Sequence, residues 1–363
     1  MELQVQKPLP NGQGLFLRSE KIWTLYIYLA ISTPTMKKLF LLLLFTHSVI
    51  LSYGQIIHGQ VLDQETRKPV DYASVFFNGT FVGTSTNEKG EFELDVTAYA
   101  NRALQISAVG YRSTSLRSFK AGDHYTVLLK KDLLEIPEVS IESESLIRAR
   151  KRSMRIFKDE FLGQSRNAKA CVIINEEDIT FNYQSDRDTL RAFARKPLHI
   201  LNNSLGYQIT YYLDKFEYDK VHKTTSFAGN IIFNLDMVVN GRMRKEYEAR
   251  RKKTYYGSCK HFFSALWLNK HSTEGFRVQE VESVYPLERK DFVFEDADGK
   301  KYFTYHQNLE IAYDYYLTTV SFRYPSVYFG KDGFFEPEAI LWYGYMSHAR
   351  IADWLPYEYS PEL

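Results

Sequence analysis

The 363-residue sequence has little cysteine, almost no charge imbalance and no familiar catalytic motif. Its 46 lysines and arginines face 44 aspartates and glutamates, whereas a nucleic-acid-binding protein normally carries a clear basic surplus. The sequence has neither a Gly-x-Ser-x-Gly nucleophile motif nor a glycine-rich phosphate-binding loop. We therefore expect no nucleic-acid partner, no cofactor and no catalytic residue of these common kinds.

Cysteine occurs only twice, at Cys171 and Cys259. Two cysteines can form one bridge at most, which is not the disulfide framework of a small secreted domain. The sequence does not say whether the two side chains come within bonding distance. One bridge and two buried thiols therefore both remain open.

The apolar run at residues 39–45 is too short to span a bilayer comfortably, because a transmembrane helix needs about 20 apolar residues. It follows Lys37 and Lys38 and precedes the small residues Ser52 and Gly54. A basic start, a short leucine-rich segment and small residues at its end are the three parts of a secretory signal peptide. This pattern predicts export.

We interpret residues 1–35 as an upstream extension and residues 36–54 as the signal peptide, so that the mature chain begins at Gln55. Residues 1–54 hold five lysines and arginines and two glutamates, so their removal changes the net charge from +2 to −1. An anchor that also uses residues 22–31 is the alternative, but it would place two lysines in the middle of the membrane. We expect the protein in the periplasm or at the outer-membrane periphery.

Short alternating segments separated by turn residues follow from residue 55 to residue 141. Side chains alternate along a strand, so Ala73, Val75 and Phe77 share one face, and Phe92 and Leu94 share another. Roughly seven such segments in under ninety residues predict a small β-sandwich.

The order of glycines and apolar residues in this region resembles the carboxypeptidase regulatory-like domain. That resemblance implies a seven-stranded, transthyretin-like sandwich over residues 55–141, of a kind common in secreted Bacteroidota proteins and without peptidase chemistry. Its implied role is structural or docking. The resemblance rests on Gly59, Val61, Asp63, Pro69, Ala73, Val75, Gly79, Thr80, Gly83, Thr84, Thr86, Asn87, Gly90, Phe92, Gly110 and Tyr111.

Residues 142–165 are predicted to form a helical linker. Ile147, Met154, Phe157 and Phe161 have helical spacing, and Gly163 ends the segment. The other face is basic from Arg148 to Lys158. Such a face is more often solvated, and peripheral membrane contact with anionic lipid headgroups is the alternative interpretation.

Residues 166–363 are predicted to form an α+β domain with a mostly antiparallel sheet. The sequence resembles a group of uncharacterised Bacteroidota envelope proteins, through Phe161-Leu162-Gly163, Leu205-Gly206-Tyr207 and Tyr256-Gly257-Ser258 among others. This resemblance implies no activity. The predicted strands are 171–174, 179–183, 189–194, 206–233, 276–284, 301–306 and 311–323, a hairpin turn is predicted at 332–333, and the predicted helices are 242–253, 258–269 and 346–355.

Two segments offer candidate chemistry. His271-Ser272-Thr273-Glu274, with His306 and His348 downstream, has the spacing of a zinc peptidase site, but two fixed positions are a weak motif and we interpret the segment as a solvated loop without metal. Ser258 and His261 can share a helix face as nucleophile and base. The alternative is that Ser258 caps the helix and His261 packs inward.

Tyrosines crowd the extended segments. Exposed rows of tyrosine suit the binding of sugars or peptides, and the alternative is that these tyrosines simply build the sheet, because tyrosine has a high strand propensity. We therefore place a candidate binding site at Tyr207, Tyr211, Arg251 and His261. The leading hypothesis is an exported, non-catalytic envelope protein that binds or docks a glycan, a peptide or a partner protein. The rival is a periplasmic hydrolase with its site near His261, using Ser258 and Arg251 as well.

Overall fold

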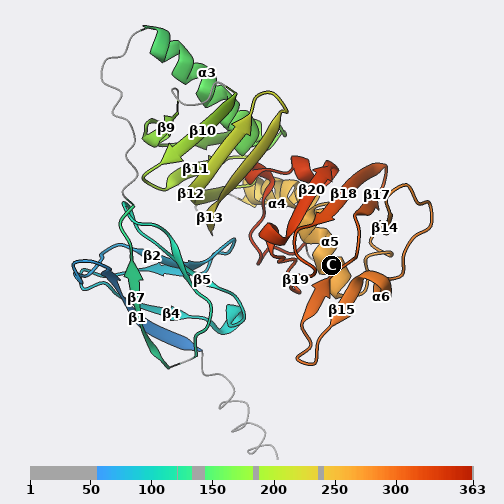
Figure 1. The fold of residues 1–363 in the computed structure, drawn as a ribbon, viewed down its shortest axis with the longest axis horizontal. Coiled ribbons are helices and arrows are strands. Elements are labelled where there is room, and N and C mark those ends of the chain that lie inside the picture. The colour runs from blue at the N-terminus through green and yellow to red at the C-terminus, as the bar shows by residue number, and fades with distance from the viewer. Residues whose placement is uncertain (1–54, 121, 133–143, 183–187, 236–240, 362–363) are drawn as a thin grey trace, which may run out of the picture. The chain divides into compact units, whose positions relative to one another are not determined.

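A computed structural model describes residues 55–120, 122–132, 144–182, 188–235 and 241–361 (Figure 1). The predicted extension and signal peptide lie outside these residues. Among the described residues, no helix is both long and apolar enough to cross a membrane.

The N-terminal region is rich in strands, as predicted, and its seven strands form two sheets around one core. The sheets have the orders β4-β1-β7 and β3-β2-β5-β6. The predicted inward residues Ala73, Val75 and Phe77 are fully buried in a shared apolar cluster. The strands are β1 (Ile56–Asp63), β2 (Ser74–Phe77), β3 (Gly83–Ser85), β4 (Glu91–Asp95), β5 (Leu104–Ser107), β6 (Thr114–Leu116) and β7 (His124–Leu129), with the short helix η1 (Thr97–Tyr99) between β4 and β5.

Strand β2 is buried on both faces. Phe76 lies between Val75 and Phe77, so its side chain points away from the sandwich core. It is nevertheless fully buried, because its ring stacks on Tyr212 with the ring centroids 5.4 Å apart. The outer face of β2 is thus covered by the rest of the chain at Phe76.

The turn after β2 adds hydrogen bonds to the edge of the second region. The Gly79 N–H donates to the carbonyl of Ile231 over 2.8 Å, and the Phe233 N–H donates to the carbonyl of Thr80 over 3.0 Å. Gly79 has a φ of +78°, and a Cβ there would lie 2.5 Å from the Tyr357 ring. Glycine is therefore required by both the conformation and the close packing.

A six-stranded antiparallel sheet and one long helix form the second region. The predicted helix is confirmed as α3 (Glu144–Phe161), and its residues Met154, Phe157 and Phe161 pack into the core of this sheet. Ile147, predicted in the same stripe, is instead 51% exposed, since no part of the sheet core reaches it. The strands are β8 (Cys171–Ile173), β9 (Ile179–Phe181), β10 (Thr189–Ala194), β11 (Leu198–Asn202), β12 (Tyr207–Asp219) and β13 (Thr224–Asn234).

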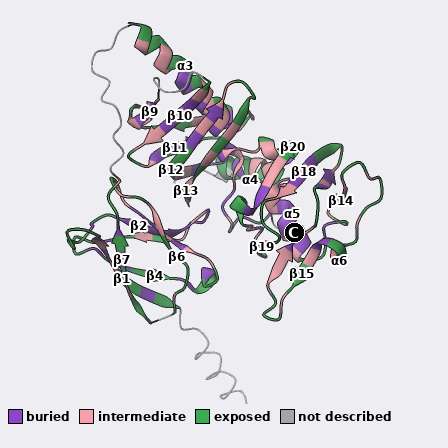
Figure 2. Ribbon diagram, in the orientation of Figure 1, coloured by how far each residue is buried: buried purple, intermediate pink, exposed green. Residues whose placement is uncertain are grey.

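The remaining residues build two smaller antiparallel sheets around α5, whose inward residues are largely buried (Figure 2). The sheets have the orders β14-β17-β18-β20 and β15-β16-β19 and share a third apolar cluster. The mixed α and β character with antiparallel sheets is as predicted. The elements are α4 (Gly241–Tyr255), α5 (Cys259–Trp267), β14 (Phe276–Glu280), α6 (Arg289–Phe292), β15 (Val293–Glu295), β16 (Lys301–Phe303), β17 (Leu309–Tyr313), β18 (Tyr316–Phe322), β19 (Val327–Phe329) and β20 (Ile340–Gly344).

The predicted helix at 346–355 is wrong. This segment forms two separate 3₁₀ turns, η5 (Tyr345–His348) and η6 (Ile351–Asp353), joined by extended residues. Met346 packs into the cluster around α5, whereas Ile351 and Leu355 pack into the cluster under α3. One straight helix could not supply both clusters, so the chain changes direction between the two turns.

Both cysteines are free thiols in the structure. Burial raises the pKa of Cys171 and that of Cys259 to about 12. Neither is therefore a thiolate at neutral pH, and neither has the electropositive surroundings of a reactive cysteine.

The covered face of β2 generates a testable prediction. In the whole protein, Phe76→Ser should lower the free energy of unfolding by about 3–5 kcal/mol, because a fully buried aromatic ring is lost. In residues 55–141 alone, the same change should reduce self-association, because Phe76 would then face solvent. Urea titration and analytical ultracentrifugation measure the two effects. Val109→Ala, at an exposed sandwich residue, is the control, and equal losses for both variants would contradict the prediction.

Candidate functional site

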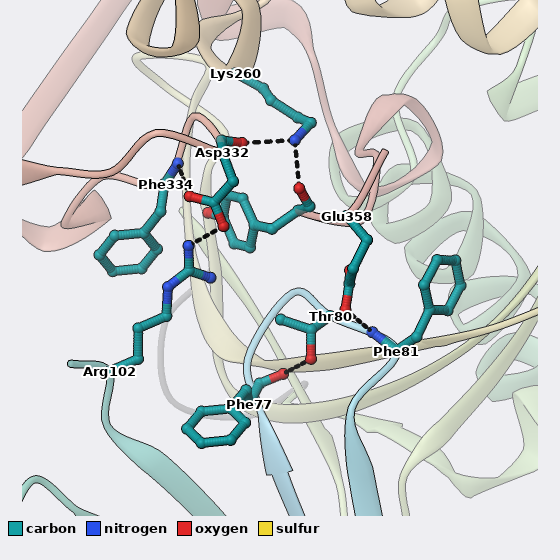
Figure 3. Close-up of polar contacts among 9 residues, drawn as sticks. Phe77, Thr80, Phe81, Arg102, Lys260, Asp332, Phe334 and Glu358 are labelled. Carbon is teal, nitrogen blue, oxygen red and sulfur yellow. Dashed lines mark hydrogen bonds and ion pairs between the residues drawn. The ribbon is translucent and has the colours of Figure 1, made fainter. Parts of the chain in front are cut away.

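A cleft of about 710 Å³ is the first candidate site. One wall is η1 with the residues that follow it, and the other is formed by α5, the turn at 330–332 and the C-terminal segment from Tyr357 onward. Its volume lies within the range of ligand pockets, about 300–1,000 Å³. Figure 3 shows the polar contacts of four residues of its lining, Arg102, Lys260, Asp332 and Glu358, with one another and with neighbouring residues.

An arginine and an aspartate meet at the base of the cleft. The Arg102 guanidinium pairs with the Asp332 carboxylate, and it lies over the rings of Tyr99, Phe334 and Tyr357 at 4.3–4.9 Å from the centroids. Its Nη1 is buried without a hydrogen-bond partner in the structure. The three rings face the guanidinium and offset part of that cost through cation–π attraction.

Lys260 of α5 joins the same group of contacts. Its ammonium donates to the carbonyl of Asp332 over 2.6 Å and to the carbonyl of Tyr357 over 2.9 Å (Figure 3). Burial lowers the pKa of Lys260 to about 8, although the charge of Asp332 opposes the shift. Two backbone carbonyls and a nearby carboxylate thus hold a cation that burial disfavours.

The C-terminal segment ties the sandwich to α5. The Tyr357 N–H donates to the carbonyl of Gly79 over 2.8 Å, and the Glu358 carboxylate accepts from the Phe81 N–H over 2.9 Å. Burial, followed by the charge of Glu358, raises the pKa of Tyr99. The charged groups of the inner wall are therefore bound to one another and to the backbone.

His261 lines the cleft but is packed inside its wall, with 2% of its surface exposed. Its Nδ1 accepts a hydrogen bond from the Gly257 N–H over 3.1 Å, so the ring proton lies on Nε2, 3.4 Å from the Glu274 carboxylate. Burial lowers the pKa of His261, and Glu274 opposes this only in part. The ring also packs against Tyr255 and Phe276, with centroids 4.9 and 4.8 Å away.

Ser258 does not point its hydroxyl at the His261 ring. The Ser258 Oγ donates to the carbonyl of Tyr255 over 2.6 Å and accepts from the His261 backbone N–H over 3.1 Å. The hydroxyl is therefore the N-cap of α5, the second of the two alternatives weighed from the sequence. A nucleophile and a base need a hydrogen bond between their side chains, and this pair does not form one.

Of the other predicted binding residues, two tyrosines lie in the core and Arg251 is half-buried. Tyr207 and Tyr211 are each 1% exposed, because the ring of Phe81 packs on the first and that of Phe161 in α3 packs on the second. Arg251 donates to the carbonyls of Leu205 and Gly206 and stacks over Tyr207 at 4.1 Å. The structure thus buries Tyr207 and Tyr211 and leaves Arg251 half-buried over Tyr207.

The metal motif and the basic helix also have structural partners. His271 is buried rather than solvated, packed against Phe292 at 5.8 Å, and no cluster of metal-ligating side chains occurs among the described residues. In α3, Arg150 donates to the carbonyls of Glu176 and Ile179, so part of the basic face binds its own sheet. Arg148 and Arg155 remain exposed.

Sequence reasoning did not find Arg102, Lys260 or Tyr357. The sequence predicted only the turn at 332–333, which contains their partner Asp332. That turn is confirmed by the φ of +82° at Gly333 and by its hydrogen bonds. Arg102 and Asp332 are 230 residues apart in the sequence, and no periodic pattern links them.

With this geometry in place, the comparisons with known proteins add one firm result. Residues 57–141 match the CarboxypepD_reg-like domain, as the sequence resemblance predicted. No curated protein sequence matches the chain.

Solved structures show only slight likeness. A candidate membrane-associated protein of unknown function from Bacteroides fragilis NCTC 9343 is 11% identical, with 80% of this chain and 94% of that chain covered and a TM-score of 0.16. A candidate carbohydrate-binding protein from Bacteroides uniformis ATCC 8492 is 11% identical, with 44% of this chain and 59% of that chain covered and a TM-score of 0.16. A chain of a type II cohesin–X-dockerin complex from Acetivibrio cellulolyticus is 14% identical, with 28% of this chain and 74% of that chain covered and a TM-score of 0.20. These scores carry no argument about function.

The Arg102–Asp332 pair should couple the sandwich to the rest of the chain. Arg102→Ala should lower the free energy of unfolding by about 1–3 kcal/mol, since it leaves the half-buried carboxylate without its partner. A double-mutant cycle with Asp332→Ala should give a coupling energy of about 1–2 kcal/mol. The exposed pair Arg112–Asp132 is the matched control and should give about 0–1 kcal/mol. Equal coupling in both cycles would show that the cleft pair is no more than a surface contact.

His261 and His222, two of the three described histidines with shifted pKa values, predict opposite dependences on pH. His261 has a lowered pKa in the folded state, so stability is complete above its unfolded value near 6.5 and falls as pH drops below it. The pKa of exposed His222 is raised by Asp219, so its contribution is present at low pH and is lost as pH rises. His261→Gln should therefore flatten the loss of stability between pH 6.5 and 5, and His222→Gln should steepen it slightly. Urea titrations across that pH range measure the free energy of unfolding of each variant. A steeper loss of stability for His261→Gln than for the wild type would contradict the prediction.

Proposed function

We propose that the protein is exported to the periplasm or the outer-membrane periphery and acts there by binding, not by catalysis. Its CarboxypepD_reg-like domain, which we take to be a transthyretin-like sandwich, serves as one wall of the binding site. The ligand is an extended peptide segment of an envelope protein, held in the cleft between η1 and α5.

One observation carries the proposal: the charged groups on the inner wall are paired with each other. Arg102 is bound to Asp332, Lys260 to two carbonyls, and Glu358 to the Phe81 N–H. Groups held in this way build a rigid wall but are not available for proton transfer to a substrate. The interior therefore supports a role in shaping a site more than a role in chemistry.

The rim of the cleft supports a peptide as the ligand. Lys270 and Lys331 are exposed in the lining, as is Glu358, although its carboxylate also accepts from the Phe81 N–H. The aromatic side chains of Tyr256 and Tyr328 form part of the lining. A peptide presents both donors and acceptors along its backbone, with apolar side chains between them. Aromatic walls and a polar rim of mixed charge are typical of surfaces that bind such chains.

The rival hydrolase rests on the His261–Glu274 contact, which is a histidine–carboxylate pair beside a cleft. A base of this kind still needs a nucleophile or a bound water within hydrogen-bond reach. Ser258 does not supply one, because its hydroxyl caps α5. Peripheral membrane contact through the exposed arginines of α3 is compatible with either function.

Selection from a phage-displayed library of random dodecapeptides tests the binding function. We expect peptides that bind the wild-type protein and lose about tenfold or more in affinity when Lys270→Glu reverses one rim charge. Lys89→Glu changes an exposed lysine in the sandwich loop, outside the cleft lining, and should leave the affinity unchanged. Failure to enrich any peptide, or equal losses for both variants, would contradict the proposal.

Turnover of a panel of p-nitrophenyl esters and amide substrates distinguishes the rival hydrolase function from binding alone. Saturable turnover that is abolished by His261→Gln in a folded protein would move the protein to the hydrolases. The expected result is no turnover that depends on His261.

A further inference from the structure

A second concavity has a volume of about 720 Å³. It is formed where the loop after β16, residues 304–308, lies beside residues 322–325 after β18, with Asp291 of α6 at its edge. It shares no lining residue with the cleft. An inference about it is therefore independent of the peptide site.

The backbone of this concavity is firmly held. The Thr304 hydroxyl donates to the carbonyl of Pro325 over 2.7 Å, which joins the two loops. The Thr304 N–H donates to the carbonyl of Phe292, and the Arg323 N–H donates to the carbonyl of Ala339. The Tyr305 hydroxyl is bound to Glu280. Such anchoring fixes the positions from which the neighbouring side chains project.

Three polar side chains of this concavity make no hydrogen bond or ion pair within the described part of the protein. Gln307, Asn308 and Arg323 are exposed, and among the described residues none of the three is engaged in a side-chain hydrogen bond or ion pair. The amide groups of Gln307 and Asn308 and the guanidinium of Arg323 are planar, and each can make two hydrogen bonds in one plane. The amides both donate and accept. This contrasts with the cleft, whose polar groups are bound to each other.

An aromatic ring completes the concavity. Tyr324 is 55% exposed and makes no ring contact with another aromatic residue in the described part of the chain. A rigid, exposed ring with a polar tip offers an apolar face to the C–H groups of a ligand. The single guanidinium of Arg323 and the single carboxylate of Asp291 balance each other, so the lining does not favour an anion.

We infer that this concavity binds a neutral oligosaccharide. A pyranose ring has an apolar face of C–H groups, which fits Tyr324, and a rim of hydroxyls that each donate and accept, which fits Asn308, Gln307 and Arg323. Neither a phosphate nor an apolar peptide would use both features. The open shape admits a chain that extends beyond one sugar.

Isothermal titration with five neutral hexasaccharides tests this inference. They are the β-1,4-linked oligomers of glucose, xylose, mannose and N-acetylglucosamine and the α-1,4-linked oligomer of glucose, and hexagalacturonate is the acidic comparison. At least one neutral hexasaccharide should bind saturably. Tyr324→Ala should weaken that binding about tenfold or more, and so should Asn308→Ala, since each removes a main contact.

Tyr315→Ala is the matched control, because Tyr315 is fully exposed at the turn between β17 and β18 and lies outside the concavity. It should leave affinity unchanged. Tyr324 has no packing partner among the aromatic residues, so its loss should leave the melting temperature within a few degrees of the wild type. The inference is overturned if no neutral hexasaccharide binds, if Tyr315→Ala weakens binding as much as Tyr324→Ala, or if only hexagalacturonate binds.

Discussion

The contact between the turn at Asn78–Phe81 and the free edge of β13 is the constraint on which the arrangement of the described residues depends. Strand β13 pairs with β12 on one side only, so its other edge would expose unpaired backbone groups. The turn supplies two backbone hydrogen bonds to that edge, and the Asn78 side chain adds a third by accepting from the Ile231 N–H. With the turn in place, Phe76 and Tyr212 stack, and Phe81 reaches the core under α3.

This contact also explains why the cleft exists. Once the sandwich is held against β13, η1 and Arg102 come opposite the turn at 330–332, and the C-terminal segment closes the space beside Gly79. The ion pair, the cation–π contacts and the Lys260 hydrogen bonds then satisfy polar groups that would otherwise be buried without partners. The cost of burying Lys260 is visible in its lowered pKa, and two carbonyls hold the ammonium in place.

The two concavities differ in how much of their polar chemistry is already used. In the cleft, hydrogen bonds and ion pairs within the protein occupy the inner groups, and aromatic walls and rim charges remain for a ligand. In the concavity around Tyr324, the backbone and the hydroxyls of Thr304 and Tyr305 carry the internal hydrogen bonds, and the side chains of Gln307, Asn308 and Arg323 are left free. A group that is paired internally gains little by binding a ligand, because it must first give up its partner. This difference is the reason for assigning different ligand classes to the two sites.

The sequence by itself determined the elements whose signals are local. The alternation in β1–β7 identified Ala73, Val75 and Phe77 as core residues, Ser258 was available as an N-cap for α5, and the resemblance identified the family of residues 57–141. These predictions depend on strand period, capping and turn chemistry, which act over a few residues.

Only the tertiary structure decided whether the side of an element that faces away from its own core is buried or exposed. Alternation placed Phe76 outward and Tyr207 on a face of its strand, but it could not say that Tyr212 would cover the first or that Phe81 would pack on the second. The same limit applies to Arg102 and Asp332, and to the segment at 346–355, which two different cores divide into two turns. Burial depends on which distant surface arrives, and that surface is set by long-range packing rather than by neighbours along the chain.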